Sequence, residues 1–295
     1  MRQRITEEFR KQVIDYYLQR PMSINTLAEH FGICGITASR ALGDTPHYPK
    51  NRLFNPNLNE DFFKEIDDEF KAYFLGLIIS DGNVYDPNDS SHSTAHSGSK
   101  WVSITLQDYD SYMLGIFRNK IGLSASVASD GRGSSYVAVR STKMANDLEK
   151  YGIFQRKSFD TKYPDNIQFD LHRHLIRGII DGDGSIHAYF HYDSKRNRNR
   201  FKHRISCCGT HRLMTEMVDI IKNNIELEFV PNVYDYKNRM LSEFKVTNIH
   251  DMYLFGKWLY EGSHVFLERK HDEFKKFTEH YGLEYNIPIC NPSTT

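Results

Sequence analysis

The chain contains 295 residues, 39% hydrophobic, 26% charged and 13% aromatic, a composition that excludes a disordered, collagen-like or coiled-coil protein. Its 38 Lys and Arg balance 38 Asp and Glu, so the net charge alone indicates no partner. No apolar run approaches the roughly 20 residues of a membrane span, and the first residues lack the apolar segment of a secretory signal. We therefore expect a cytoplasmic protein that does not associate with a membrane.

Residues 1–45 predict three short helices. Residues 6–20 carry an apolar stripe at helical spacing, a second helix follows from Ser23 to the turn at Gly32, and a third covers 35–42. A small residue at Ala28 and a glycine turn suit a helix-turn-helix, whose two helices must cross closely. We interpret this segment as an all-α DNA-binding domain that reads a major groove with Thr37, Ser39 and Arg40; an ordinary helical hairpin in a core is the alternative.

Residues 46–60 hold three prolines and four asparagines without a period, which predicts an extended linker. An internal repeat follows, since YFLGLIISDGNV (73–84) matches LIRGIIDGDGSI (175–186). After each motif the pattern predicts the same alternation of strands and helices. We therefore expect an α+β protein with two pseudo-symmetric αββαββα units, over residues 61–165 and 166–285.

The two motifs place small residues four apart, Gly76 with Ser80 and Gly178 with Gly182, so that two helices can pack with their backbones close. Asp81 and Asp183 would then emerge side by side at the helix ends. Two carboxylates forced together repel each other unless they share a cation, and Mg²⁺ prefers such oxygen ligands. We expect a divalent metal site there, with backbone groups near Gly82 and Gly184 as further ligands.

The segments GLIISDG and GIIDGDG resemble the LAGLIDADG motif of homing endonucleases, in the single-chain branch that carries two motifs. The resemblance implies a saddle of two sheets that binds double-stranded DNA, and a monomer that cuts it at a specific sequence. It also implies that Asp81 and Asp183 bind two or three Mg²⁺ ions, replaceable by Mn²⁺, and that Lys157 and Lys270 organise solvent around the cut. The second motif has an earlier acid, Asp181, and the first motif has Ile79 at the matching position. In the family this position is usually not a metal ligand.

Alternating residues along the predicted strands would face away from the helices and contact DNA. Ile186, Ala188 and Phe190 are expected to face inward, whereas the loop at 195–200 should supply charge. The predicted contacts from strands are Trp101, Ser103, Thr105, Gln107, Tyr136, Ala138, Arg140, Ser185, His187, Tyr189, His191, Lys202, Arg204, Ser206, Lys237 and Lys245. Those from the loop are Lys195, Arg196, Arg198 and Arg200.

Two other functions stay open on the same residues. One is a transcriptional regulator that binds DNA without cutting it, and the less favoured one is an intron maturase that binds RNA. Retention of both Asp81 and Asp183 favours the nuclease, because a regulator has no physical need for two converging carboxylates. The chain ends lack the residues of protein splicing, so we expect a free-standing or intron-encoded protein of a bacterium or phage.

Overall fold

The computed structural model describes residues 5–20, 22–43, 45, 55, 57–87, 89, 98–155, 160–237 and 240–285. The chain divides into two compact units. The helical unit contains Met1–Asn59 and Lys120–Ser126, and the α/β unit contains Glu60–Asn119 and Val127–Thr295. Among the described residues, no helix is both long enough and apolar enough to cross a membrane.

The helical unit contains α1 (Glu7–Gln19), α2 (Ile24–His30) and α3 (Gly35–Leu42), close to the predicted ranges. The Ser23 hydroxyl caps α2 by accepting a hydrogen bond from the Thr26 N–H. Gly32 has a φ of +62°, which lets the Ile33 N–H turn back onto the Ala28 carbonyl at 2.9 Å. The three helices enclose one apolar core, formed by Val13, Tyr17, Ile24, Leu27, Ala28, Ala38, Ala41 and Leu42.

Most of the predicted linker, 46–54 and 56, lies outside the described residues. Its described end is bound by the loop 120–126 of the same unit. The Asn59 N–H donates to the Ile121 carbonyl at 2.8 Å, and the Ser124 N–H donates to Asn55 Oδ1 at 2.9 Å. This end of the segment is therefore held by hydrogen bonds.

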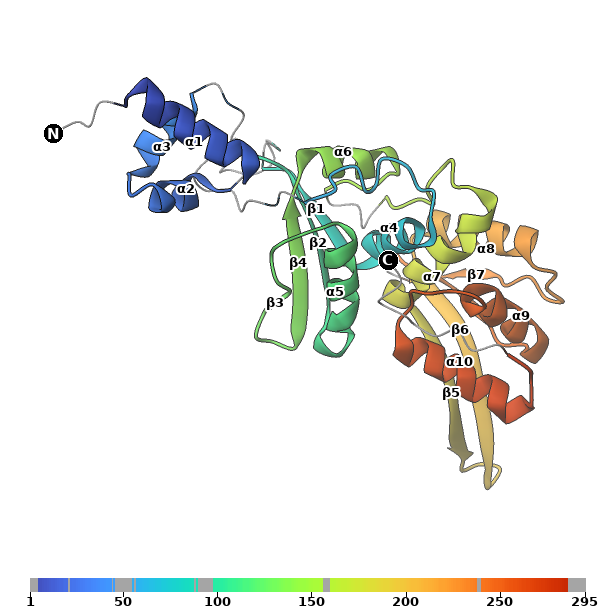
Figure 1. Ribbon diagram of the computed structural model, residues 1–295. Coiled ribbons are helices and arrows are strands. Elements are labelled where there is room, and N and C mark those ends of the chain that lie inside the picture. The colour runs from blue at the N-terminus through green and yellow to red at the C-terminus, as the bar shows by residue number, and fades with distance from the viewer. Residues whose placement is uncertain are drawn as a thin grey trace. The chain divides into compact units, whose positions relative to one another are not determined.

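The α/β unit consists of two halves, each with a four-stranded antiparallel sheet and covering helices (Figure 1). The first half has the strand order β1-β2-β4-β3. Its elements are α4 (Glu69–Asp81), β1 (Gly82–Tyr85), β2 (Trp101–Gln107), the 3₁₀ turn η1 (Asp108–Asp110), α5 (Ser111–Lys120), β3 (Ala128–Ser129), β4 (Ser134–Arg140) and α6 (Thr142–Lys150).

The second half has the matching order β5-β6-β8-β7, which confirms the predicted repeat and the α+β class. Its elements are the 3₁₀ turn η3 (Phe169–Leu171), α7 (His172–Asp183), β5 (Gly184–Asp193), β6 (Arg198–Gly209), α8 (His211–Asn224), β7 (Val233–Asp235), β8 (Ser242–Val246), α9 (Ile249–Tyr260) and α10 (Glu268–Tyr281).

The second half differs from the first in the length of its first hairpin. β5 and β6 pair from Gly184 opposite Cys207 to Asp193 opposite Arg198, whereas β8 pairs only with residues 205–209 of β6. Residues 189–202 therefore form a two-stranded ribbon that extends beyond the sheet. In Figure 1 this ribbon reaches past α10.

Both sheets have an inner face that packs on helices and an outer face. Along β2, Val102, Ile104 and Leu106 are buried and the residues between them are not, because side chains of a strand alternate between faces. β4 shows the same alternation, with Val137 and Val139 buried. The core thus lies between the sheet and its helices, and the outer face carries the more exposed side chains.

Candidate metal centre and nucleic-acid interface

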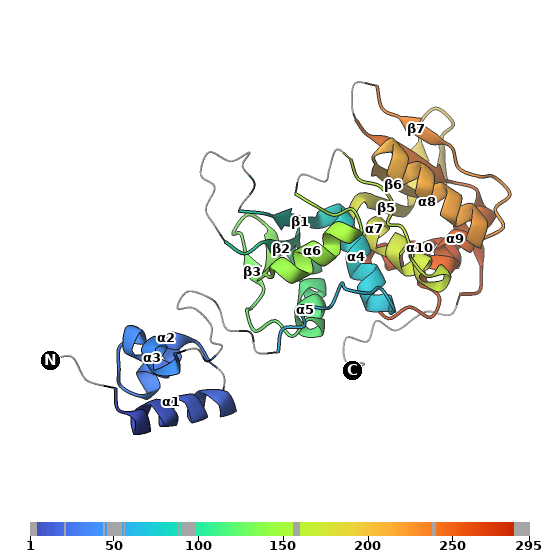
Figure 2. The same cartoon turned by 90° about the horizontal axis from the view of Figure 1, so that it is seen from above.

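The helices α4 and α7 pack directly against each other, side by side in both views of the structure (Figures 1 and 2). A Cβ atom on Gly76 would lie 2.2 Å from the Leu175 carbonyl oxygen, and one on Gly178 would lie 2.1 Å from the Tyr73 carbonyl oxygen. Only glycine allows so close an approach of two backbones. The predicted glycine contact between the two motif helices is thus present.

The same packing brings the ends of the two helices together. α4 ends at Asp81 and α7 ends at Asp183. A Cβ atom on Gly182 would lie 2.5 Å from Asp81 Oδ2, so the Asp81 carboxylate lies against the residue that precedes Asp183. Asp81 is half-buried and Asp183 is exposed. The acids of the two motifs therefore occur at adjacent helix C-termini.

This position suits a divalent cation. Two carboxylates combine there with the negative ends of two helix dipoles, and hard oxygen donors are what Mg²⁺ takes. Within the described ranges no group of three or more His, Cys, Asp or Glu side chains is placed to hold a metal ion. Of the predicted backbone ligands, the Gly184 carbonyl accepts a hydrogen bond from Lys270 Nζ at 2.7 Å, and this positive charge makes it a poor cation ligand.

Lys270 lies buried beneath the end of α7. Its ammonium donates to the carbonyls of Ile180 and Asp181, both at 2.6 Å, and of Gly184 at 2.7 Å. Burial lowers the pKa of Lys270, and the neighbouring Asp181 carboxylate opposes that shift. Its predicted counterpart, Lys157, lies outside the described residues.

Asp181, the earlier acid of the second motif, is a buried carboxylate that joins neighbouring elements by hydrogen bonds. Its Oδ2 accepts hydrogen bonds from the Tyr73 hydroxyl and the Leu267 N–H, both at 2.8 Å, and the side chain is buried. Burial raises the pKa of Asp181, although Lys270 and these hydrogen bonds act in the opposite direction. The carboxylate thus links α7 to α4 and to the segment before α10. In the first copy Ile79 fills the matching place with a buried apolar side chain.

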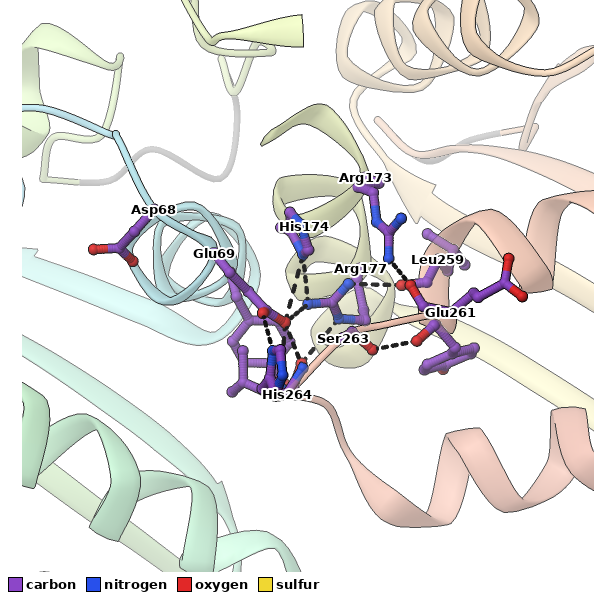
Figure 3. Close-up of polar contacts among 12 residues, drawn as sticks. Asp68, Glu69, Arg173, His174, Arg177, Leu259, Glu261, Ser263 and His264 are labelled. Atoms are coloured by element: carbon purple, nitrogen blue, oxygen red, sulfur yellow. Dashed lines mark hydrogen bonds and ion pairs between the residues drawn. The ribbon is translucent and has the colours of Figure 1, made fainter. Parts of the chain in front are cut away.

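A second polar network joins the two helices near their N-termini (Figure 3). The fully buried Arg177 guanidinium donates to Glu69 Oε1 at 2.7 Å and to the Leu259 carbonyl at 2.6 Å. Glu69 also accepts from the His264 N–H at 2.7 Å, and His174 Nδ1 lies 2.8 Å from Arg177 Nη2. Sequence reasoning missed this network because it joins residues up to 195 positions apart.

The outer face of the first sheet carries the predicted residues. Trp101, Thr105, Gln107, Tyr136 and Arg140 are exposed, and Ser103 and Ala138 are half-buried. The Arg140 guanidinium lies 5.0 Å from the centre of the Trp101 ring. The strand pairing adds two residues that sequence reasoning missed, Asn83 opposite Ser103 and Tyr85 opposite Trp101. The buried Val84 between them was the available signal.

One prediction for the second sheet is wrong, and another holds in direction only. Phe190 was expected to face the helices, and its ring does contact His280 of α10 as well as Phe201, but it is 66% exposed because it belongs to the ribbon beyond the sheet. Ser206 was expected to be exposed, but it is 3% exposed. It lies opposite Lys245 in the pairing and hydrogen bonds to Glu243, so β8 covers it.

Other predicted residues of this sheet follow the expectation in part. Exposed side chains include Tyr189, His191, Lys202 and, at the ribbon tip, Lys195, Arg196, Arg198 and Arg200. Ser185, His187 and Arg204 are half-buried, and Ser185 Oγ lies 2.6 Å from His187 Nε2.

Lys245 is paired with the buried Glu243 at 2.7 Å. Glu243 also accepts from the Tyr236 hydroxyl. Burial acts to raise the pKa of Glu243, but the hydrogen bonds from Lys245 and Tyr236 lower it below its usual value. Lys237, two residues after the end of β7, is exposed. Glu243 was not predicted, since a strand glutamate normally stays solvated.

In the helical unit, α3 presents Arg40 as an exposed side chain and Thr37 and Ser39 as half-buried ones. The Thr37 hydroxyl lies 3.1 Å from Cys34 Sγ at the start of the helix. Ile36 is also exposed, by 55%. The side of α3 opposite its buried Ala38 and Ala41 is therefore polar at Arg40 and apolar at Ile36.

No protein-family model and no curated protein matches the chain. Among solved structures, I-SmaMI bound to an uncleaved DNA target in the presence of calcium ions is similar, with a TM-score of 0.50 and 14% identity over 74% of this chain and 93% of that one. The I-SmaMI LAGLIDADG homing endonuclease bound to cleaved DNA is similar with a TM-score of 0.50 and 12% identity, over 72% and 88% of the two chains. At such identities the likeness concerns the fold.

Proposed function

We propose that this chain, which has the fold of the LAGLIDADG homing endonucleases, is a sequence-specific endonuclease that hydrolyses phosphodiester bonds of double-stranded DNA with divalent metal held by Asp81 and Asp183. The observation that carries the proposal is the pair of acids at adjacent ends of two glycine-packed helices, one from each half. A fold of two matching halves suits a duplex, whose two strands present two phosphodiester bonds to cut.

Bound Mg²⁺, or Mn²⁺ in its place, supplies a Lewis acid and a water of lowered pKa. Asp81 and Asp183 would hold two or three such ions, and the packed helices fix the two carboxylates close together before substrate binds. In support, one similar I-SmaMI structure is bound to an uncleaved DNA target in the presence of calcium ions, and another is bound to cleaved DNA.

The outer faces of the two sheets bind the DNA as a saddle. Arg140, Gln107, Lys202 and Arg204 have the donor groups that read guanine or adenine in a major groove. The basic tip of the ribbon contacts phosphates on one side only, since its counterpart segment PNDSSHSTAHSGS is nearly neutral. The protein acts as a monomer, because one chain supplies both acids and both sheets.

The helical unit adds a second DNA contact. We assign α3 as the recognition helix of a helix-turn-helix, with Arg40 and Thr37 directed at base edges. Tethering two modest binding surfaces raises the affinity of the whole without new contacts in either.

The test is cleavage of duplex DNA from the chain's own genomic neighbourhood in Mg²⁺, with EDTA as the negative control. Asp81→Asn and Asp183→Asn should abolish double-strand cleavage and leave DNA binding in Ca²⁺ largely intact. Asp219→Asn, an exposed acid on α8, is the matched control and should cleave normally. Unimpaired cleavage by Asp183→Asn would remove this site, and binding without any cleavage by the unchanged protein would identify a regulator.

A further inference from the structure

The ammonium group of Lys270 is fully used by the protein itself. Lys270 is 4% exposed, and its nitrogen lies 2.6 Å from two carbonyl oxygens, 2.7 Å from a third and 3.5 Å from that of Gly182. An ammonium has three N–H bonds, and three short contacts engage all of them. No donor remains for a water molecule or a phosphate.

The carbonyls that it binds belong to the final turn of α7 and the residue after it. The last four carbonyls of a helix have no partner within the helix, and a cation placed there also interacts favourably with the helix dipole. Lys270 thus caps the C-terminus of α7 by hydrogen bonds to the Ile180 and Gly184 carbonyls, which lie on either side of Asp183 in the chain. The backbone that carries the Asp183 carboxylate is thereby fixed.

A second contact from the same segment supports this role. The Leu267 N–H donates to Asp181 Oδ2 at 2.8 Å, so residues 267–270 hold the end of α7 through both a side chain and the backbone. The first motif has Ile79 where the second has Asp181, and an isoleucine side chain accepts no hydrogen bond. The second motif therefore carries the side-chain acceptor for this contact, and the first motif does not.

We propose that Lys270 is a positioning residue, which fixes the last turn of α7 so that Asp183 is held ready to bind a divalent ion, and that it does not organise solvent at the cut. This rests on the proposed function and gives Lys270 a different role from the one that the family resemblance implies. Partners that orient a metal ligand commonly change metal affinity by about 10-fold to 100-fold when they are removed.

The test compares Lys270→Met with Lys275→Met, a half-buried lysine on the same helix whose ammonium is paired with Glu279 and which serves as the matched control. Ca²⁺ binding to the DNA-free protein is measured by calorimetry, and amide hydrogen exchange is followed over residues 180–186. Lys270→Met should weaken Ca²⁺ binding by at least about 10-fold and accelerate exchange in that segment. Lys275→Met should change neither.

Cleavage distinguishes the two roles. A positioning lysine predicts that Lys270→Met needs more Mg²⁺ for half-maximal single-turnover cleavage, and approaches the normal rate when Mg²⁺ saturates. Unchanged Ca²⁺ affinity and exchange, with a rate that stays low at saturating Mg²⁺, would overturn the proposal. If the unchanged protein does not cleave DNA, the proposed function fails, while Ca²⁺ binding and exchange still decide the role of Lys270.

A variant that retains the charge covers the case in which Lys270→Met does not fold. Lys270→Arg keeps the cation, but a planar guanidinium cannot direct its N–H bonds at three carbonyls around one point. Circular dichroism would first establish that Lys270→Arg is folded. Its Ca²⁺ affinity should then lie below that of the unchanged protein, and equal affinity would contradict the proposal.

Discussion

The contact of α4 with α7 makes a sharp prediction for Gly178→Ala. A methyl group at this position would lie 2.1 Å from the Tyr73 carbonyl oxygen and 2.9 Å from the Leu77 nitrogen. Ordinary contact begins at 3.4 Å, so the two backbones must separate by about 1.3 Å (3.4 minus 2.1). Both obstructing atoms belong to a helix backbone, which cannot move aside as a flexible side chain can.

The expected loss of stability follows from two opposing effects. Overpacking of this kind lowers the free energy of unfolding by about 3 kcal/mol, the upper end of its usual range, because neither helix can yield. Replacing a helical glycine with alanine by itself raises the free energy of unfolding by up to about 1 kcal/mol. The net loss of roughly 2 kcal/mol corresponds to a fall in Tm of roughly 4–8 °C for a unit of this size.

The control is Gly115→Ala in the middle of α5, where a Cβ atom would meet nothing within 4 Å. Gly115→Ala should raise the free energy of unfolding by about 0.5–1 kcal/mol, so the two variants should move the Tm in opposite directions. Thermal unfolding followed by circular dichroism measures both. If Gly178→Ala is as stable as Gly115→Ala, the two helix backbones are not in the close contact described here.

The remaining predictions concern pH, salt and the helical unit. Burial and the nearby charge of Arg177 lower the pKa of His174 to about 2, so its contribution to stability is complete above the unfolded pKa of about 6.5 and declines by about 1.4 kcal/mol for each pH unit below it. The free energy of unfolding, measured in urea at about pH 7.5 and about pH 5.5, should fall less in His174→Asn, which keeps an acceptor for Arg177, than in the unchanged protein. An equal fall in both proteins would refute the role of His174. Neutral replacement of the four charges at the ribbon tip should flatten the slope of log K against log salt by roughly 0.9 for each lost phosphate contact, whereas an unchanged slope would place the tip off the DNA. Deletion of residues 1–50 should weaken DNA binding and shorten the footprint on one side; an unchanged footprint would show that the helical unit makes no DNA contact.

The elements that depend on local pattern could be predicted. The third helix was expected over 35–42 and covers Gly35–Leu42, and the two motif helices end at Asp81 and Asp183. Alternation along 101–107 identified the outer face of β2 correctly. The repeat, together with the small residues four apart in each motif, predicted that the two acids would lie side by side, because each acid ends one of two closely packed helices.

Only the tertiary structure decided which side chains of these alternating patterns are buried. Phe190 and Ser206 follow the same alternation as their neighbours, yet Phe190 is exposed and Ser206 is buried. Their environments are set by where β8 ends and by the Glu243 side chain, neither of which is local in sequence.

The role of Lys270 depends on the same distinction. Its residue type and its position in the closing segment of the second half were visible in the sequence, but its partners lie 86 to 90 positions away at the end of α7. Periodicity records which side of an element a residue occupies, since that depends on neighbours two to four positions apart. Burial, hydrogen-bond partners and pKa depend on which elements pack together, and the α4–α7 contact and the segment before α10 determined them here.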